Sequence, residues 1–155
     1  MKFTKDEKKL IEYTKKKVSE HVKKRKGAGL YDALYAFVLS ESGKIYEGTP
    51  IECTQQNANC CAERVALANM ILNETENAKV SCILTADPVP ENSSLKAITL
   101  CGACRSALID YATKNSSILC TSYIRHKNNW TIFERIDKYK PSELYPHPYV
   151  PVNWD

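Results

Sequence analysis

Two short cysteine motifs constrain the fold of this sequence more than any other feature. Cys61-Ala-Glu63 begins one Ala-, Leu- and Val-rich segment, and Cys101-Gly-Ala-Cys104 begins a second segment forty residues later. Segments that are apolar on nearly all sides are typical of buried helices. At a helix N-terminus, unpaired N–H groups and the helix dipole stabilise thiolates. We therefore expect two buried helices that begin with cysteine and face one another across neighbouring strands.

The remaining patterns predict one layered α/β domain over residues 1–155, because helical and strand-like segments alternate along the chain. Residues 141–155 form a tail that is rich in proline and aromatic residues. The expected helices lie at 4–26, 59–71 and 102–113, with a short one from Pro141, and the expected strands at 30–39, 44–47, 80–86, 118–124 and 130–135.

The basic residues are concentrated in the first helix, within residues 1–29, which holds half of them. Thr4-Lys-Asp-Glu7 is a capping box, and apolar residues from Phe3 to Val22 recur at helical spacing. Residues 1–26 hold 11 basic and 4 acidic residues, whereas the rest of the chain holds 11 basic and 14 acidic residues. We expect a helix packed on the core, and a contact with RNA or membrane is the alternative. The rest of the chain, residues 27–155, has an excess of acidic residues, which argues against a nucleic-acid channel, because such a channel needs a positive groove.

The cysteine count and the absence of an export signal indicate a cytoplasmic protein. The sequence has 7 cysteines and no apolar segment after its basic N-terminus. Its longest apolar stretches are about seven or eight residues, far below the ~20 that span a bilayer. In a reducing compartment, clustered cysteines indicate metal binding or catalysis rather than disulfides.

Cys61, Cys101 and Cys104 are the candidate metal ligands. If the two helix starts converge, three thiolates meet at one point and leave a fourth position open, which is the arrangement of a catalytic zinc. Glu63 follows a ligand by two residues, close enough to reach a water molecule at that position. Zinc deaminases use this layout. A structural zinc or a redox-active Cys-x-x-Cys pair is the alternative.

With the arginine that follows each of them, the two motifs are Cys61-Ala-Glu-Arg64 and Cys101-Gly-Ala-Cys-Arg105. They resemble the zinc motifs of the cytidine deaminases in their small three-cysteine form. Gly43-Lys-Ile-Tyr-Glu-Gly48 is similar to the hairpin that precedes the substrate loop in that family. The resemblance covers roughly residues 30 to 145. It implies a three-layer α/β/α fold with a mixed sheet of about five strands, and a homotetramer with its sites at subunit interfaces.

The resemblance also implies roles for individual residues. Zn²⁺ would be held by the three cysteines, and Glu63 would act as the general acid and base. Arg64 and Arg105 lie beside ligands, where hydrogen bonds to the sulfurs would offset the negative charge; ordinary surface ion pairs are the alternative. Glu52 falls where the family places a ribose-binding glutamate.

Two departures from the family fall in the substrate pocket. Pro50 replaces an asparagine that reads the sugar, and Asp32 replaces an aromatic residue near the base. With Glu52, Asp32 would form an acidic pocket mouth, unless it lies at a solvated strand end. The default reaction is conversion of cytidine or deoxycytidine to the uridine nucleoside with release of ammonia. A different aminated heterocycle, such as a cationic, blasticidin-S-like nucleoside, is the alternative. A zinc-stabilised RNA-binding or interaction module is the third hypothesis.

The remaining candidates have simpler interpretations. Cys60 and Cys53 are expected to fill space near the site, and Cys82 and Cys120 to lie in buried strands. His21 is expected to be structural. Three aromatic residues of the tail are candidates for closing a neighbouring subunit's site: Tyr145, Tyr149 and Trp154. A clamp on the surface of their own subunit is the alternative.

Overall fold

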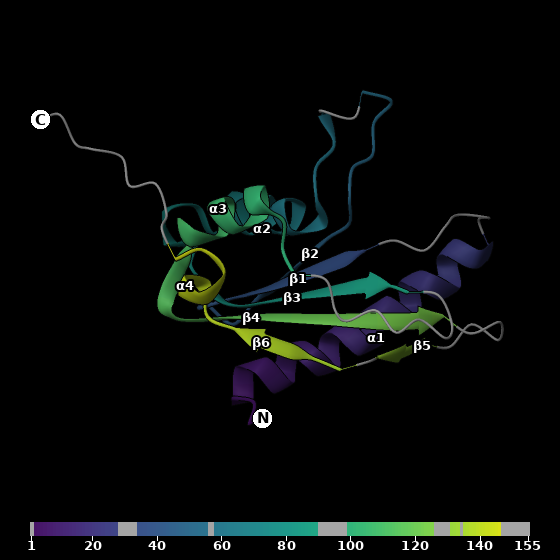
Figure 1. Ribbon diagram of the computed structural model, residues 1–155, viewed down its shortest axis with the longest axis horizontal. Helices are drawn as coiled ribbons and strands as arrows, with labels where there is room; N and C mark the ends of the chain where they lie inside the picture. Colours follow the sequence, from purple (N-terminus) through teal and green to yellow (C-terminus); the bar gives the residue numbers. More distant parts are fainter. Residues whose placement is uncertain are drawn as a thin grey trace, which may run out of the picture.

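The computed structural model describes residues 2–27, 34–55, 58–89, 99–125, 131–133 and 135–146 (Figure 1). Its elements follow in the order α1 (Lys5–Gly27), β1 (Tyr35–Ser40), β2 (Ile45–Gly48), α2 (Ala62–Glu74), a 3-10 turn (Thr75–Asn77), β3 (Val80–Pro88), α3 (Gly102–Ile109), β4 (Ala112–Arg125), β5 (Thr131–Phe133), β6 (Asp137–Tyr139) and α4 (Pro141–Leu144).

The strands form one mixed sheet in the order β2-β1-β3-β4-β5, and β6 also pairs with β4. Strands β3 and β4 are parallel, with α3 in the connection between them, and the other pairs are antiparallel. The predicted mixed sheet is therefore confirmed. Because β3 and β4 are parallel, their carboxyl ends meet at the same edge of the sheet.

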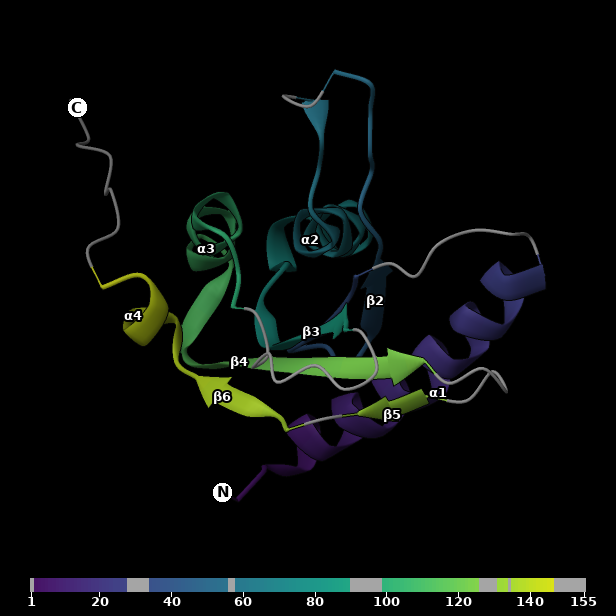
Figure 2. The ribbon, with the colours of Figure 1, turned by 45° about the vertical axis from the view of Figure 1, so that its right-hand side comes forward.

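Helices cover both faces of the sheet, which confirms the predicted three-layer fold (Figure 2). Helices α2 and α3 lie on one face and α1 lies on the other. Alternation along β3 divides its side chains between the two cores: Ile83 packs with residues of α2 and α3, whereas Leu84 and Ala86 pack with residues of α1.

Helix α1 begins at the predicted capping box and is held firmly on the sheet. The Thr4 amide donates to Glu7 Oε2 over 2.8 Å, and the Glu7 amide donates to Thr4 Oγ1 over 3.2 Å. Glu7 is itself buried and pairs with Lys138 on β6 at 2.7 Å. The predicted apolar stripe is buried at Leu10, Ile11, Thr14, Val18 and Val22. The interpretation of a helix packed on the core is confirmed.

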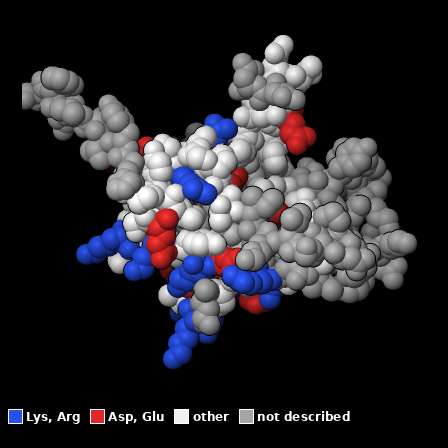
Figure 3. Space-filling view, in the orientation of Figure 1, with Lys and Arg blue, Asp and Glu red and all other residues white. Residues whose placement is uncertain are grey.

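The basic residues do not form a uniform positive field on the face drawn in Figure 3. Along its lower edge, basic side chains have acidic side chains among them. Two lysines of α1 pair with glutamates of the same helix, Lys17 with Glu20 at 3.3 Å and Lys15 with Glu12 at 3.8 Å. No helix in the described part of the chain combines the length and apolarity needed to cross a bilayer.

Several of the expected element boundaries are wrong, and the first strand begins at Tyr35 rather than at residue 30. Helix α2 begins at Ala62 rather than near residue 59, because Cys60 pairs with Ile51 as an isolated β-bridge and remains extended. Helix α3 ends at Ile109 and β4 already begins at Ala112, because Val80 of β3 pairs with Ala112. Strand β6 was not expected.

Candidate metal centre

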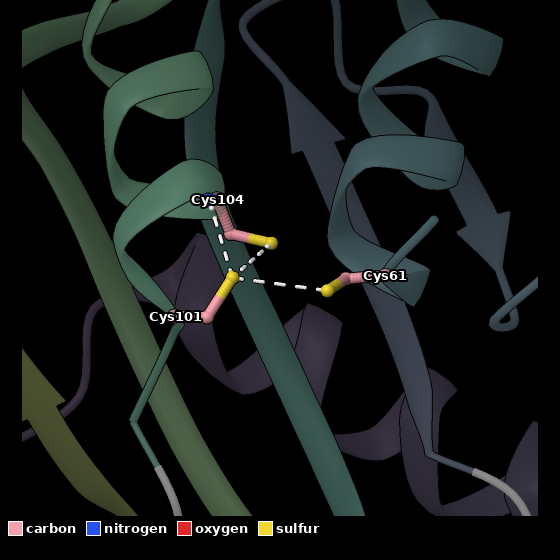
Figure 4. Close-up of side chains that lie close together, drawn as sticks. All are labelled: Cys61, Cys101 and Cys104. Atoms are coloured by element: carbon pink, nitrogen blue, oxygen red, sulfur yellow. Dashed lines mark hydrogen bonds between the residues drawn. The ribbon is translucent and has the colours of Figure 1, made fainter. Parts of the chain in front are cut away.

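The starts of α2 and α3 bring three cysteines to one point (Figure 4). Cys61 is the N-cap residue of α2 and Cys101 is the N-cap residue of α3. Cys101 Sγ lies 3.7 Å from Cys61 Sγ and 3.3 Å from Cys104 Sγ, and the Cys104 amide donates to Cys101 Sγ over 3.4 Å. The predicted convergence of the two motifs is therefore present in the structure.

The three sulfur atoms fit a zinc ion. Sulfur ligands at the usual Zn–S distance of ~2.3 Å in a tetrahedral site lie about 3.8 Å from one another. All three Sγ atoms lie within 4.8 Å of one another, and no other group of three metal-binding side chains this close occurs in the described chain. Soft thiolate ligands favour zinc over hard cations such as magnesium or calcium.

The surroundings of each sulfur affect its ionisation. Burial raises the pKa of Cys61 and of Cys104. Burial acts in the same direction on Cys101, but hydrogen bonds from the Cys104 amide and from the other two thiols outweigh it and lower the pKa of Cys101. The site therefore contains one thiol that ionises readily and two that are costly to ionise without a neighbouring cation.

Glu63 lies in the first turn of α2 and is 4% exposed. Burial is the main cause that raises the pKa of Glu63, and the Cys104 thiol and Arg64 act against it. A carboxyl group that is buried beside the candidate metal ligands, and whose pKa is raised, suits a residue that accepts and returns protons near neutral pH.

A cavity of about 280 Å³ opens onto this cluster. Its lining includes two cysteines of the cluster, the carboxylate and two of the predicted substrate residues: Cys61, Cys101, Glu63, Pro50 and Glu52. Thr99, just before the second motif, also lines it. Asp32, the third predicted substrate residue, lies outside the described residues. The acidic mouth is therefore represented in the structure by Glu52 alone.

The two arginines lie in different surroundings. Arg64 Nη2 donates to the Asn59 carbonyl over 3.1 Å, and the neighbouring Cys60, followed by a hydrogen bond to Cys61, raises the pKa of Arg64. The role of Arg64 beside the sulfurs stays a prediction, because its 3.1 Å hydrogen bond goes to a backbone carbonyl.

The hydrogen bonds of Arg105 do not go to the sulfurs, contrary to expectation. Nε donates to the Leu100 carbonyl over 2.7 Å, Nη1 to the Leu144 carbonyl over 3.1 Å, and Nη2 to Thr99 Oγ1 over 2.9 Å. The planar guanidinium therefore joins α4 to the two residues that precede Cys101. Its contribution to the site is the position of this segment.

The other cysteines are mostly as expected. Cys82 and Cys120 are buried in β3 and β4, and Cys60 is half-buried in the β-bridge. The expectation that Cys53 fills space near the site is wrong, because its side chain is exposed. His21 is structural: it stacks on Tyr35 with ring centroids 5.1 Å apart.

Of the aromatic tail residues, Tyr145 directly follows α4, whereas Tyr149 and Trp154 lie outside the described residues. Sequence reasoning missed Asp87, a buried carboxyl at the end of β3. The only signal was one acidic residue directly after the apolar segment 80–86.

Solved structures of cytidine deaminases share the fold of this chain, although no protein-family model matches it. The cytidine deaminase of Burkholderia pseudomallei aligns over 76% of this chain and 81% of its own, with 19% identity and a TM-score of 0.60. The enzyme of Bacillus anthracis aligns over 90% and 89%, with 20% identity and a TM-score of 0.53. The enzyme of Mycobacterium tuberculosis aligns over 77% and 80%, with 18% identity and a TM-score of 0.51.

At these identities the likeness establishes the fold. The chain thus has the three-layer fold of the cytidine deaminases. Within that fold it carries a cluster of three cysteines that could bind a metal ion such as zinc.

Proposed function

We propose that this protein is a zinc-dependent hydrolytic deaminase that acts on a free aminated nucleoside and releases ammonia. The observation that supports this proposal is the combination of three thiols at two helix starts with a buried glutamate and a cavity beside them. The fold adds support, because the solved structures it resembles are cytidine deaminases. A structural zinc site would not need Glu63 next to its ligands.

In this proposal Cys61, Cys101 and Cys104 hold the metal and Glu63 moves the protons. A bound zinc ion supplies a Lewis acid that makes water a nucleophile near neutral pH. Glu63 takes a proton from the attacking water and gives it to a ring nitrogen of the substrate. It then transfers a second proton to the amino group, which leaves as ammonia. Burial of Glu63 keeps bulk water from competing for these protons.

Cytidine or deoxycytidine is the default substrate, and a cationic aminated heterocycle is the alternative. Glu52 lines the cavity and supplies an acceptor for sugar hydroxyls or for a cationic group. Pro50 lines the same cavity but offers no donor, which departs from the asparagine of the cytidine deaminase pattern. Recognition of the sugar must therefore differ from that pattern.

The test is ammonia release from cytidine by the purified, zinc-loaded protein. Glu63→Gln keeps the shape of the side chain and removes its proton-transfer function, so we expect a loss of at least about 100-fold. Glu143→Gln, an exposed change in α4, is the matched control and keeps full activity. Release that persists in Glu63→Gln contradicts the assigned role. If wild-type protein with bound zinc releases nothing, a panel of cationic aminated heterocycles tests the alternative.

We further propose a cytoplasmic homo-oligomer, with a homotetramer expected from the resemblance. The clustered thiols need a reducing compartment to stay available for a metal. Light scattering on the eluted protein gives the number of subunits, and a monomer at micromolar concentration contradicts this expectation.

A further inference from the structure

A patch of buried polar side chains lies on the sheet beneath the start of α2. Asp87 on β3 and Ser122 on β4 are direct partners in the parallel register. Alternation places both on the face that carries α2 and α3, because Leu84 and Ala86 of β3 and Tyr123 of β4 pack on the α1 side. The patch therefore lies at the carboxyl ends of the two parallel strands.

These side chains are buried, and each has an oxygen atom without a hydrogen-bond partner among the described residues. Asp87 is 7% exposed and Ser122 is 1% exposed. In the described structure Asp87 Oδ2 and Ser122 Oγ have no partner, and neither does Glu63 Oε2. Burial, followed by the charge of Glu63, raises the pKa of Asp87 to about 7, so Asp87 lies within electrostatic range of Glu63.

Three neighbouring buried polar atoms without partners require an explanation, because native structures satisfy the great majority of such atoms. An unpaired buried hydroxyl or carboxyl costs several kcal/mol unless a hydrogen-bonding group completes it. The patch offers two carboxyl groups and one hydroxyl, so it is rich in acceptors. A small cation that donates hydrogen bonds satisfies both the charge and the acceptors.

We propose that Asp87, Ser122 and Glu63 form a subsite for ammonium. A deaminase releases ammonia as its leaving group whatever ring it acts on, so the choice of ligand rests on the function proposed above. The subsite would receive the leaving group on the side of Glu63 that faces the sheet. Asp87 and Ser122 would act there as binding residues and take no part in proton transfer to the ring.

The experiment compares ammonium with potassium, a cation of nearly the same radius that donates no hydrogen bond. Calorimetry on the zinc-loaded protein measures binding of ammonium chloride and of potassium chloride at constant ionic strength. We expect wild-type protein to bind ammonium in preference to potassium. Asp87→Asn and Ser122→Ala should each weaken ammonium binding by about 10-fold, the effect of one hydrogen bond to a charged group. Asp110→Asn, an exposed change directly after α3, should leave it unchanged.

Equal binding of ammonium and potassium, or ammonium binding that is unaffected in Asp87→Asn, would overturn the proposal. Asp87→Asn replaces a buried carboxyl by a neutral group of the same shape. A second readout is inhibition of the deamination by added ammonium, which should weaken about 10-fold in Asp87→Asn. Ammonium binding without ammonia release from any heterocycle would contradict the proposed function and leave the subsite intact. Ammonia release without ammonium-selective binding would contradict the subsite and leave the proposed function intact.

Discussion

Cys61 Sγ and Cys101 Sγ lie 3.7 Å apart, although the two residues begin different helices and are separated by forty positions. Each cysteine is the N-cap of its helix, so the backbone fixes where its sulfur lies. The parallel pairing of β3 and β4, together with the packing of α2 and α3 on one face, brings these two helix starts together. The cysteine cluster is thus a consequence of the layer arrangement.

Loss of one cysteine of the cluster should abolish tight zinc binding. Cys104→Ser keeps the size of the buried side chain but replaces a soft ligand with a hydroxyl. We expect about one zinc ion per chain in the wild-type protein. Loss of a hydrogen bond to a metal ligand lowers metal affinity by about 10- to 100-fold. We expect loss of a ligand itself to lower the zinc affinity of the variant by more than this. Elemental analysis and competition with a chelator measure both quantities.

Cys53→Ser is the matched control for this experiment, since Cys53 is exposed and lies outside the cluster. It should bind zinc as the wild-type protein does. Wild-type affinity in Cys104→Ser would remove this residue from the ligand set.

Arg105 should contribute to stability through the segment that it holds. Arg105→Met removes donors to Leu100, Leu144 and Thr99 and keeps much of the apolar stem. At about 1 kcal/mol for each hydrogen bond, we expect a loss of roughly 3 kcal/mol in the free energy of unfolding. Urea denaturation measures the change, and Lys114→Met, an exposed change in β4, is the control. A loss equal to that of the control would show that these bonds contribute little.

The cysteine site was predictable because its signals are local. Two short motifs and the apolar segments after them define both helix starts within a few residues of sequence. The partners of Arg105 were not predictable, since Leu144 lies 39 positions away and offers only a backbone carbonyl. Strand β6 has three residues, too few for a periodic pattern, and it exists through its pairing with Ile118–Cys120. The burial of Asp87 likewise depends on elements distant in the sequence.

Gly48 should tolerate no side chain, because β2 approaches α2 closely there. A Cβ atom at Gly48 would clash with the Ala62 carbonyl and lie 2.5 Å from the Ala66 amide nitrogen. These are backbone atoms of the helix that begins after Cys61, so α2 itself would have to move. We expect Gly48→Ala to lower the free energy of unfolding by about 1–3 kcal/mol, the usual effect of overpacking, and to weaken zinc binding.

Gly102→Ala provides the comparison, since a Cβ atom there meets nothing within 4 Å. Its free energy of unfolding should stay within about 0.5 kcal/mol of the wild-type value. Similar losses in the two variants would mean that the approach of β2 to α2 does not limit this position.

Asp87 should make the protein less stable as pH rises toward neutrality. In the fold, burial and then the charge of Glu63 raise its pKa from 3.8 to about 7. Between these values the folded chain holds a proton that the unfolded chain has released. The stabilisation is therefore complete below about pH 4 and is lost as pH rises through about 7. A shift of about three units corresponds to roughly 4 kcal/mol.

Asp87→Asn removes this titration and keeps the shape of the side chain. Urea unfolding of both proteins from pH 4.5 to 8 gives the difference in their free energies, and contributions that the two proteins share cancel in this difference. We expect the variant to gain stability relative to wild type as pH rises, with most of the change complete by about pH 8. A difference that stays constant across this range would mean that Asp87 ionises as an ordinary exposed carboxyl, and would place it away from Glu63.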